Sequence, residues 1–311
     1  MHVISEIKVS APGSLMLMGE HAVLFGHRAL ACAVDKRIHV TLNPRPDRNI
    51  VIRSALAQYQ GSLDELPDDS RLSFVLFAIN QCKTQLSSGF ELHIESELSH
   101  TVGLGSSAAV TVATVNALLA FRGDQVGPEE LFEHALSVVH GVQGRGSGTD
   151  LAASVYGGLI AYTVSPRQIS PLPGLPAISL YYAGYKTKTP DVLARVAEST
   201  QAFPELYRSL YQLMNETTLT AESAVASQDW QQLGQLMNLY QGLMDALGVN
   251  DAVLSDIIYR LRESSAIRGV KISGSGLGDC VIALGEDTSL SVPYERIDVA
   301  VSNTGVLCDV N

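Results

Sequence analysis

The sequence predicts an α+β protein, because its strand-like and helix-like segments are grouped in separate runs along the chain. Short segments near both ends alternate apolar and polar residues, which is the pattern of half-buried strands. Residues 191–265 instead carry leucines at helical spacing over almost their whole length. The chain has 311 residues, and a length of this order suggests about two domains.

The first half of the chain is expected to contain most of the strands. Residues 90–95, FELHIE, alternate Phe, Leu and Ile with Glu and His. Further strands are predicted at residues 6–10, 37–42, 49–54, 159–163 and 178–183. Helices are predicted at residues 72–86, 106–121 and 128–140, and N-cap residues at 68–70 precede the first of them.

The second half is expected to be mainly helical before it returns to strands. Four prolines gather in a short segment that marks the junction between two domains: Pro166, Pro171, Pro173 and Pro176. After the helical residues 191–265, strands are predicted at 270–273, 280–284 and 297–301. We place the boundary after residue 170, so that the predicted domains comprise residues 1–170 and 171–311.

The charge of the chain narrows the choice of partners. A formal net charge of -11 argues against a nucleic-acid-binding protein, whose affinity would come largely from Lys and Arg. A phosphorylated small molecule remains compatible, because backbone N–H groups and helix N-termini bind phosphate without side-chain charge. No apolar run approaches the roughly 20 residues that span a bilayer, so no membrane partner is expected.

The expected compartment is a reducing cytoplasm. The four cysteines are far apart and form no CxxC pair, which indicates neither a zinc site nor a disulfide framework. Glu6 and Lys8 interrupt the apolar stretch that a signal peptide would need. The oligomeric state stays open, with a homodimer as one option.

The strongest functional signal lies at residues 102–109, which read VGLGSSAA. This segment follows a strand and opens a helix, where unpaired N–H groups and the helix dipole favour an anion. The arrangement is typical of a phosphate-binding loop, although a glycine turn with a serine N-cap would look the same. It is not a Walker A loop, since no Gly-Lys-Ser/Thr sequence is present.

Two further segments place polar residues where they could act on a substrate. Residues 19–26, GEHAVLFG, set Glu20 beside His21, as either a polar substrate site or a solvated turn would. Residues 144–150, GRGSGTD, set Asp150 at or near a helix N-terminus. There a carboxylate serves either as an N-cap or as the group that deprotonates a hydroxyl attacking a phosphate.

A fourth glycine-rich segment, residues 273–280, reads SGSGLGDC. Its spacing differs from the GxGxxG fingerprint, and a strand is expected after it in place of a helix. These two features disfavour a Rossmann-type dinucleotide site. The remaining interpretations are a plain turn between two strands and one wall of a ligand pocket.

In this order, the four segments resemble the motifs of the GHMP kinases, a superfamily that includes galactokinase, homoserine kinase, mevalonate kinase and phosphomevalonate kinase. The resemblance implies a two-domain α+β fold with the active site between the domains. It also implies ATP and Mg²⁺ as cofactors and a small-molecule alcohol as substrate. Residues 1–170 would then be the N-terminal ATP-binding domain, and residues 171–311 the C-terminal GHMP domain.

The resemblance assigns the nucleotide and metal sites to named residues. GLGSSAA would hold the ATP phosphates through Gly103, Leu104, Gly105, Ser106, Ser107 and Ala108. Ser106 or Ser107 would also help to hold Mg²⁺. The magnesium-binding glutamate of the family is expected one helical turn before the pair His140-Gly141, where this chain has Leu136. Glu133 is therefore the substitute carboxylate that we expect for the metal.

The resemblance also assigns the substrate site. GEHAVLFG is similar to the mevalonate kinase pattern, so Glu20 and His21 would face the substrate, together with Ser147 and Lys186. Asp150 would be the catalytic carboxylate next to the attacking hydroxyl.

One departure concerns the partner of that carboxylate. Mevalonate kinases usually read APGK, with a lysine that pairs with the catalytic aspartate, whereas this chain has Ser14 at the corresponding place. The charge would then have to come from Lys186, Lys188 or Arg145.

The expected activity is the ATP-dependent phosphorylation of mevalonate in isoprenoid precursor synthesis. The segments GSGTDLAASVYGG and SGSGLGDC look closer to phosphomevalonate kinases, so that activity, or another GHMP kinase activity, is the alternative. A nucleotide-binding protein that has lost catalysis is a third hypothesis, because a fold does not guarantee its usual function.

Overall fold

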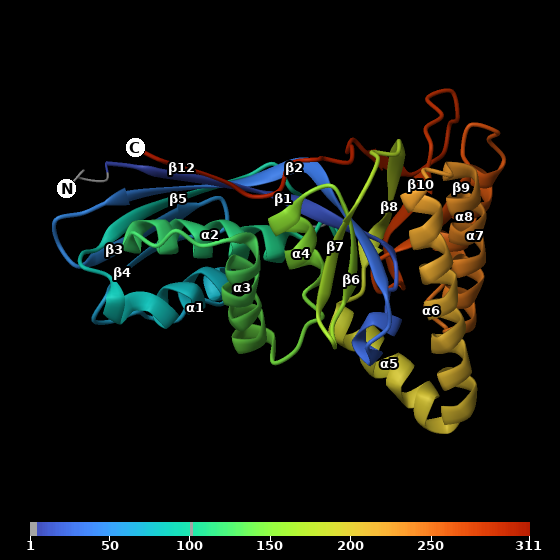
Figure 1. Cartoon of the computed structure of the whole chain (residues 1–311), viewed down its shortest axis with the longest axis horizontal. Helices are drawn as coiled ribbons and strands as arrows, with labels where there is room; N and C mark the ends of the chain where they lie inside the picture. Colours follow the sequence, from blue (N-terminus) through green and yellow to red (C-terminus); the bar gives the residue numbers. More distant parts are fainter. Residues whose placement is uncertain (1–4, 100–101) are drawn as a thin grey trace.

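The computed structural model describes residues 5–99 and 102–311. They form two β-sheets toward opposite ends of the long axis of the molecule, each packed against its own helices (Figure 1). This arrangement confirms the predicted α+β class. In the described part of the chain, no helix is both long enough and apolar enough to cross a membrane.

The larger sheet has eight strands, most of them antiparallel. Their order is β12-β1-β2-β5-β3-β4, with β6 paired to β2 and β7 paired to β6. The strands are β1 Ile7–Met18, β2 Ala29–Pro44, β3 Asn49–Ser54, β4 Gln58–Ser62, β5 Phe90–Ser96, β6 Leu159–Thr163, β7 Gln168–Leu172 and β12 Leu307–Val310. The first strand runs well beyond the predicted residues 6–10, and its register with β2 shifts between Pro12 and Ser14. A shift of this kind locally re-aims the side chains of a strand, here in the APGS segment.

Four helices cover one face of the larger sheet (Figure 1). They are α1 Ser73–Cys82, α2 Ser106–Arg122, α3 Pro128–Gln143 and α4 Thr149–Tyr156. Helix α2 buries a run of small residues that includes Ala108, Ala109 and Ala113. Small side chains let α2 lie close to β1 and β2, which it contacts. The N-terminus of α2 is thereby fixed at the edge of the sheet that faces the rest of the molecule.

The smaller sheet consists of four antiparallel strands in the order β11-β8-β10-β9. They are β8 Ile178–Lys186, β9 Gly269–Ser273, β10 Gly278–Leu284 and β11 Glu295–Ile297. Helices α7 Trp230–Ala246 and α8 Ala252–Arg262 pack against this sheet, while α6 Pro204–Ala226 packs on α7 and on β2, and α5 Thr189–Ala202 packs on α6. Helix α7 comes so close to β9 that a Cβ atom on Gly269 would overlap the backbone of Gly234. The backbones of α7 and β9 are therefore in direct contact at these two glycines, which fixes β9 in position.

The structure corrects several predicted boundaries. The strand expected at 297–301 is β11 at Glu295–Ile297, while Val301 makes only an isolated bridge to Val34. The helix expected over 72–86 ends at Cys82. Helix α3 continues to Gln143, beyond the predicted end at residue 140.

Three strands were absent from the prediction, namely β4, β7 and β12. The strand β4 follows a short turn, and β7 contains Pro171 within the segment predicted as a junction. Proline is tolerated there because β7 pairs on one side only, with β6. The boundary after residue 170 stays a prediction, and strand pairing places β12, the last strand, in the larger sheet.

Candidate active site

A cavity of about 640 Å³ lies where the two sheets meet. All four segments singled out in the sequence contribute to its wall. The N-terminal segment supplies Ser14, Glu20 and His21, and the VGLGSSAA segment supplies Gly103, Gly105, Ser106, Ser107 and Ala108. The GRGSGTD segment supplies Arg145, Gly146, Ser147, Gly148 and Asp150. The SGSGLGDC segment supplies Ser273, Gly274, Ser275 and Asp279. Segments from both halves of the chain therefore form one site.

The VGLGSSAA segment forms the loop that leads into α2. Gly105 adopts the left-handed conformation (φ 66°) as the residue before the helix, and a side chain there would overlap Ser14 Oγ. Ser106 and Ser107 occupy the first helical positions and line the cavity. Leu104 is the exception among the predicted phosphate-binding residues, because its side chain is buried and its carbonyl accepts the Ser14 N–H at 3.0 Å. The helix N-terminus thus faces the cavity with its unpaired N–H groups.

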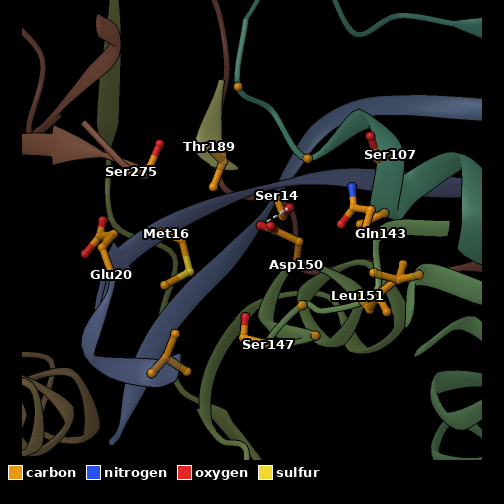
Figure 2. Close-up of a pocket in the computed structure, with 18 of the residues that line it drawn as sticks. Ser14, Met16, Glu20, Ser107, Gln143, Ser147, Asp150, Leu151, Thr189 and Ser275 are labelled. Carbon is orange, nitrogen blue, oxygen red and sulfur yellow. Dashed lines mark hydrogen bonds between the residues drawn. The ribbon is translucent and has the colours of Figure 1, made fainter. Parts of the chain in front are cut away.

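Asp150 lies in the first turn of α4 and opens onto the centre of the cavity. Ser14 Oγ donates a hydrogen bond to Asp150 Oδ1 at 2.8 Å, drawn as a dashed line in Figure 2. The surrounding walls limit hydration, and this desolvation raises the pKa of the Asp150 carboxyl above that of an ordinary aspartate. The Ser14 hydrogen bond and the charge of Lys186 oppose the rise, while the charge of Glu20 adds to it.

Glu20 belongs to a buried ion pair at one end of the cavity. Lys271 Nζ donates to Glu20 Oε1 and to the carbonyl of Ile272, and both charged side chains are almost fully buried. Burial lowers the pKa of Lys271, and Glu20 acts against that shift. The second oxygen, Glu20 Oε2, is buried and accepts no hydrogen bond from the described residues. It is therefore an acceptor available to a ligand.

His21 offers a second acceptor beside it. Its Nε2 lies 2.8 Å from the carbonyl of Ser275, an atom that can only accept, so Nε2 carries the proton. Burial lowers the pKa of His21, which favours the neutral ring. Nδ1 is then an acceptor, and it is buried without a partner in the described part of the protein. Two unpaired acceptors at one end of a cavity suit a ligand that carries hydroxyl groups.

A carboxylate that we had not selected from the sequence lies at the phosphate loop. Asp279 Oδ1 accepts the Gly103 N–H at 2.8 Å, and Asp279 Oδ2 lies 2.8 Å from Lys186 Nζ. The sequence did place Asp279 in a glycine-rich segment, which was the available signal. Gln143 also lines the cavity, from the end of α3, and likewise was not predicted.

The other predicted residues divide into two groups. Ser147 and Lys186 line the cavity, as does Arg145, whereas Lys188 does not. Glu133, the expected metal carboxylate, lies outside the cavity because it is on the exposed side of α3 and pairs with Arg167. In the described residues, no group of three or more His, Cys, Asp or Glu side chains could hold a metal ion.

Two family matches define the class of protein. The GHMP kinases N terminal domain family matches residues 73–158, which include the phosphate loop and Asp150. The GHMP kinases C terminal family matches residues 221–291, which include Lys271 and Asp279. The fold and the composite site are therefore those of a GHMP kinase, an ATP-using enzyme that phosphorylates an alcohol.

Similar proteins narrow the family further. The chain is 34% identical to the mevalonate kinase of Methanothermobacter thermautotrophicus over 277 residues, 88% of each chain. It is 32% identical to that of Thermococcus sibiricus over 305 residues, which cover 92% of this chain and 91% of the relative. The structure of L. major mevalonate kinase in complex with R-mevalonate matches with a TM-score of 0.77 and 26% identity, covering 91% of this chain and 88% of the other. The chain belongs to the mevalonate kinase family, as the resemblance predicted.

Proposed function

We propose that this protein transfers the γ-phosphoryl group of ATP to the primary hydroxyl of mevalonate, a reaction of isoprenoid precursor synthesis. One observation carries the proposal. Asp150 lies between Ser107 of the phosphate loop on one side and Glu20 on the other, as Figure 2 displays. A hydroxyl bound near Asp150 would therefore have the phosphates of ATP on one side and hydrogen-bond acceptors on the other. The relatives named mevalonate kinase identify the alcohol.

The described residues account for most of what the reaction needs. The N-terminus of α2 and the N–H groups before it would hold the phosphates of ATP. Glu20 Oε2 and His21 Nδ1 would accept hydrogen bonds from the substrate. Asp150, with its pKa raised by desolvation in the cavity, would accept the proton of the attacking hydroxyl, and a base is more effective when its pKa lies nearer the working pH. Catalysis would rest mainly on positioning and on charge neutralisation.

The cavity also has donors that fit Mg²⁺. Ser106 and Ser107 present hydroxyl groups at the start of α2, and Mg²⁺ is commonly held by few protein oxygens together with substrate phosphates. These two residues would hold the ion, which would neutralise charge on the phosphates. The exposed Glu133 has no part in this proposal.

The test is ADP release in a coupled assay, run in parallel with mevalonate and with phosphomevalonate. We expect turnover with mevalonate. Turnover with phosphomevalonate alone would reject the proposed substrate and indicate that Arg145 and Lys186, two cations of the cavity wall, bind a phosphate already on the substrate.

The role of Asp150 has its own test. Asp150→Asn keeps the size of the side chain but removes the base, so kcat should fall by about 10²- to 10⁴-fold. The affinity for ATP should change little, because the side-chain hydrogen bond of Asp150 among the described residues is with Ser14 and not with the phosphate loop. An equal loss of turnover and of ATP affinity would make Asp150 a structural residue.

A further inference from the structure

The cavity wall contains few cations that could reach a reacting phosphate. Among the described lining residues, Lys186 and Arg145 carry permanent positive charge. Lys271 lies behind Glu20, is fully buried and is held by that carboxylate. Ser14 gives Asp150 a hydrogen bond but no charge. A side-chain cation that acts together with Mg²⁺ on the transferred phosphoryl group therefore has to be Lys186 or Arg145.

Lys186 is placed to act on Asp150. Desolvation raises the pKa of the Asp150 carboxyl, and the positive charge of Lys186 acts against that rise. Lys186 is the last residue of β8 and pairs in register with Gly278 of the glycine-rich turn. Next to it, Thr187 Oγ1 donates to the carbonyl of Leu277 at 2.6 Å, which anchors the backbone. The flexible stem of the lysine can then move its ammonium group while the backbone stays in place.

In the structure, Asp279 engages this ammonium group. One oxygen of Asp279 faces Lys186 Nζ at 2.8 Å, and the other accepts the Gly103 N–H at 2.8 Å. The Asp279 carboxylate thus occupies an N–H group of the phosphate loop that could otherwise donate to a phosphate oxygen. Asp279 also has φ 66°, which is unusual for a residue other than glycine and occurs preferentially at functional sites.

We propose that Lys186 is the cation of phosphoryl transfer in this protein, and that Asp279 holds it at the phosphate loop until the phosphates of ATP displace the carboxylate. The inference rests on the proposed function. The phosphates of ATP and the Asp279 carboxylate compete for the same two donors, the Gly103 N–H and the Lys186 ammonium. ATP binding therefore releases Lys186 toward the transferred phosphoryl group beside Asp150.

The chemical step balances with these groups alone. The substrate oxygen forms a bond to the γ-phosphorus, and the bond from that phosphorus to the bridging oxygen of ADP breaks, with its electron pair going to ADP. The hydroxyl proton moves to Asp150. Lys186 stays protonated throughout and stabilises the negative charge on the transferred group.

The first experiment compares Lys186→Met with Lys186→Arg and Lys188→Met. The methionine removes the charge and keeps the length, so kcat should fall by about 10²- to 10³-fold, as when one charge-stabilising donor is lost. Lys186→Arg should recover part of the loss. Lys188→Met removes the same charge two residues away, outside the cavity wall, and should leave kcat unchanged. Wild-type kcat in Lys186→Met, or the loss in Arg145→Met in its place, would overturn the proposal.

A pH profile separates this role from a merely structural one. Without Lys186, the pKa of Asp150 rises, so the acidic limb of kcat/KM should move to higher pH. The other ionisable groups of the cavity wall are Glu20 and His21 after β1, Arg145 before α4, and Asp279 in β10. They are unchanged in Lys186→Met, so an unmoved acidic limb would count against contact between Lys186 and the reacting groups.

The second experiment measures binding of a non-hydrolysable ATP analogue by calorimetry. Asp279→Asn removes the competing charge but keeps an oxygen for Gly103, so binding should become about 3- to 10-fold tighter. Asp64→Asn, which removes an exposed carboxylate outside this cavity, should bind like the wild type. Unchanged or weaker binding in Asp279→Asn would reject the holding role.

The two experiments also distinguish the two proposals. If the wild type produces no ADP with mevalonate, the proposed substrate fails, whereas tighter binding by Asp279→Asn still supports competition at the phosphate loop. If mevalonate is phosphorylated and Lys186→Met is fully active, the proposed function stands and this inference fails. Thermal unfolding of each variant shows whether a loss reflects misfolding.

Discussion

Two lysine–carboxylate pairs lie at the same cavity and differ chiefly in burial. In the pair Lys271–Glu20, 0% and 2% of the side-chain surfaces are exposed. In the pair Lys186–Asp279, the exposed fractions are 39% and 15%. The chemistry is the same, but only the second ion pair is open to water. We infer that the first pair is a fixed part of the frame and that the second can exchange partners.

The surroundings of the two pairs support this difference. Tyr240 packs beside the buried pair, with Lys271 Nζ 5.6 Å from the ring centre, and its hydroxyl donates to the Glu20 carbonyl at 3.1 Å. These contacts hold the backbone carbonyl and Oε1 of Glu20, while Oε2 has no hydrogen-bond partner among the described residues. In the pair Lys186–Asp279, which is the open pair, the carboxylate also accepts a hydrogen bond from the Gly103 N–H. The phosphates of ATP would accept a hydrogen bond from the same N–H group. Burial thus decides which charges position a ligand and which can respond to one.

The largest expected effect follows from breaking the buried pair. Lys271→Met leaves the Glu20 carboxylate buried without its cation, and removing one member of such a pair typically costs about 3–5 kcal/mol in the free energy of unfolding. Urea denaturation of the two proteins at neutral pH measures the difference. A loss below about 1 kcal/mol, the size expected for an exposed pair, would remove the distinction between the two pairs.

A double variant sharpens this prediction. Glu20→Gln combined with Lys271→Met removes both charges, so most of the lost stability should return. If the double variant is as unstable as Lys271→Met alone, packing and not the unpaired charge explains the loss. The double variant should bind the substrate more weakly than the wild type, because the amide that replaces the Glu20 carboxylate offers the substrate a different set of hydrogen-bonding atoms.

The fold followed from the sequence wherever its pattern is local. The segments predicted at 49–54, 106–121 and 159–163 agree closely with β3, α2 and β6, since alternation and helical spacing are properties of neighbouring residues. The strand β7 was missed because Pro171 argues against a strand. Its position at a sheet edge, which permits proline, depends on pairing with β6 and cannot be read locally.

The residues of the candidate site could likewise be predicted only where the signal lies in consecutive residues. Asp150 and the phosphate loop could be predicted from glycine-rich segments, because a tight turn requires glycines within a few consecutive residues. Lys271 gave no such signal, since it sits within an ordinary strand and its partner Glu20 is 251 residues away. Glu133 was chosen as a substitute for the metal-binding glutamate that the resemblance implies near His140, and its pairing with Arg167 on the exposed side of α3 could not be foreseen.

A smaller effect is expected at the hydrogen bond between Ser14 and Asp150. Ser14→Ala removes a donor that favours the ionised carboxylate, so the pKa of Asp150 should rise further. Asp150 acts as a base only when ionised, and activity is therefore lost at a higher pH as the solution is acidified. The acidic limb of kcat/KM measures the shift. A limb that moves to lower pH would mean that Ser14 does not stabilise the charged form.

The smallest effect is expected on the free energy of unfolding when the pair Lys186–Asp279 is broken. Lys186→Met should change the free energy of unfolding by less than about 1 kcal/mol, because an ion pair that is partly open to water gains little over hydrated charges. Urea denaturation under the conditions used for Lys271→Met makes the two values comparable. The same variant is expected to lose most of its turnover, so stability and activity should separate at Lys186. A loss of stability as large as that of Lys271→Met would show that both pairs belong to the fixed frame, and Lys186 could then not be free to leave Asp279.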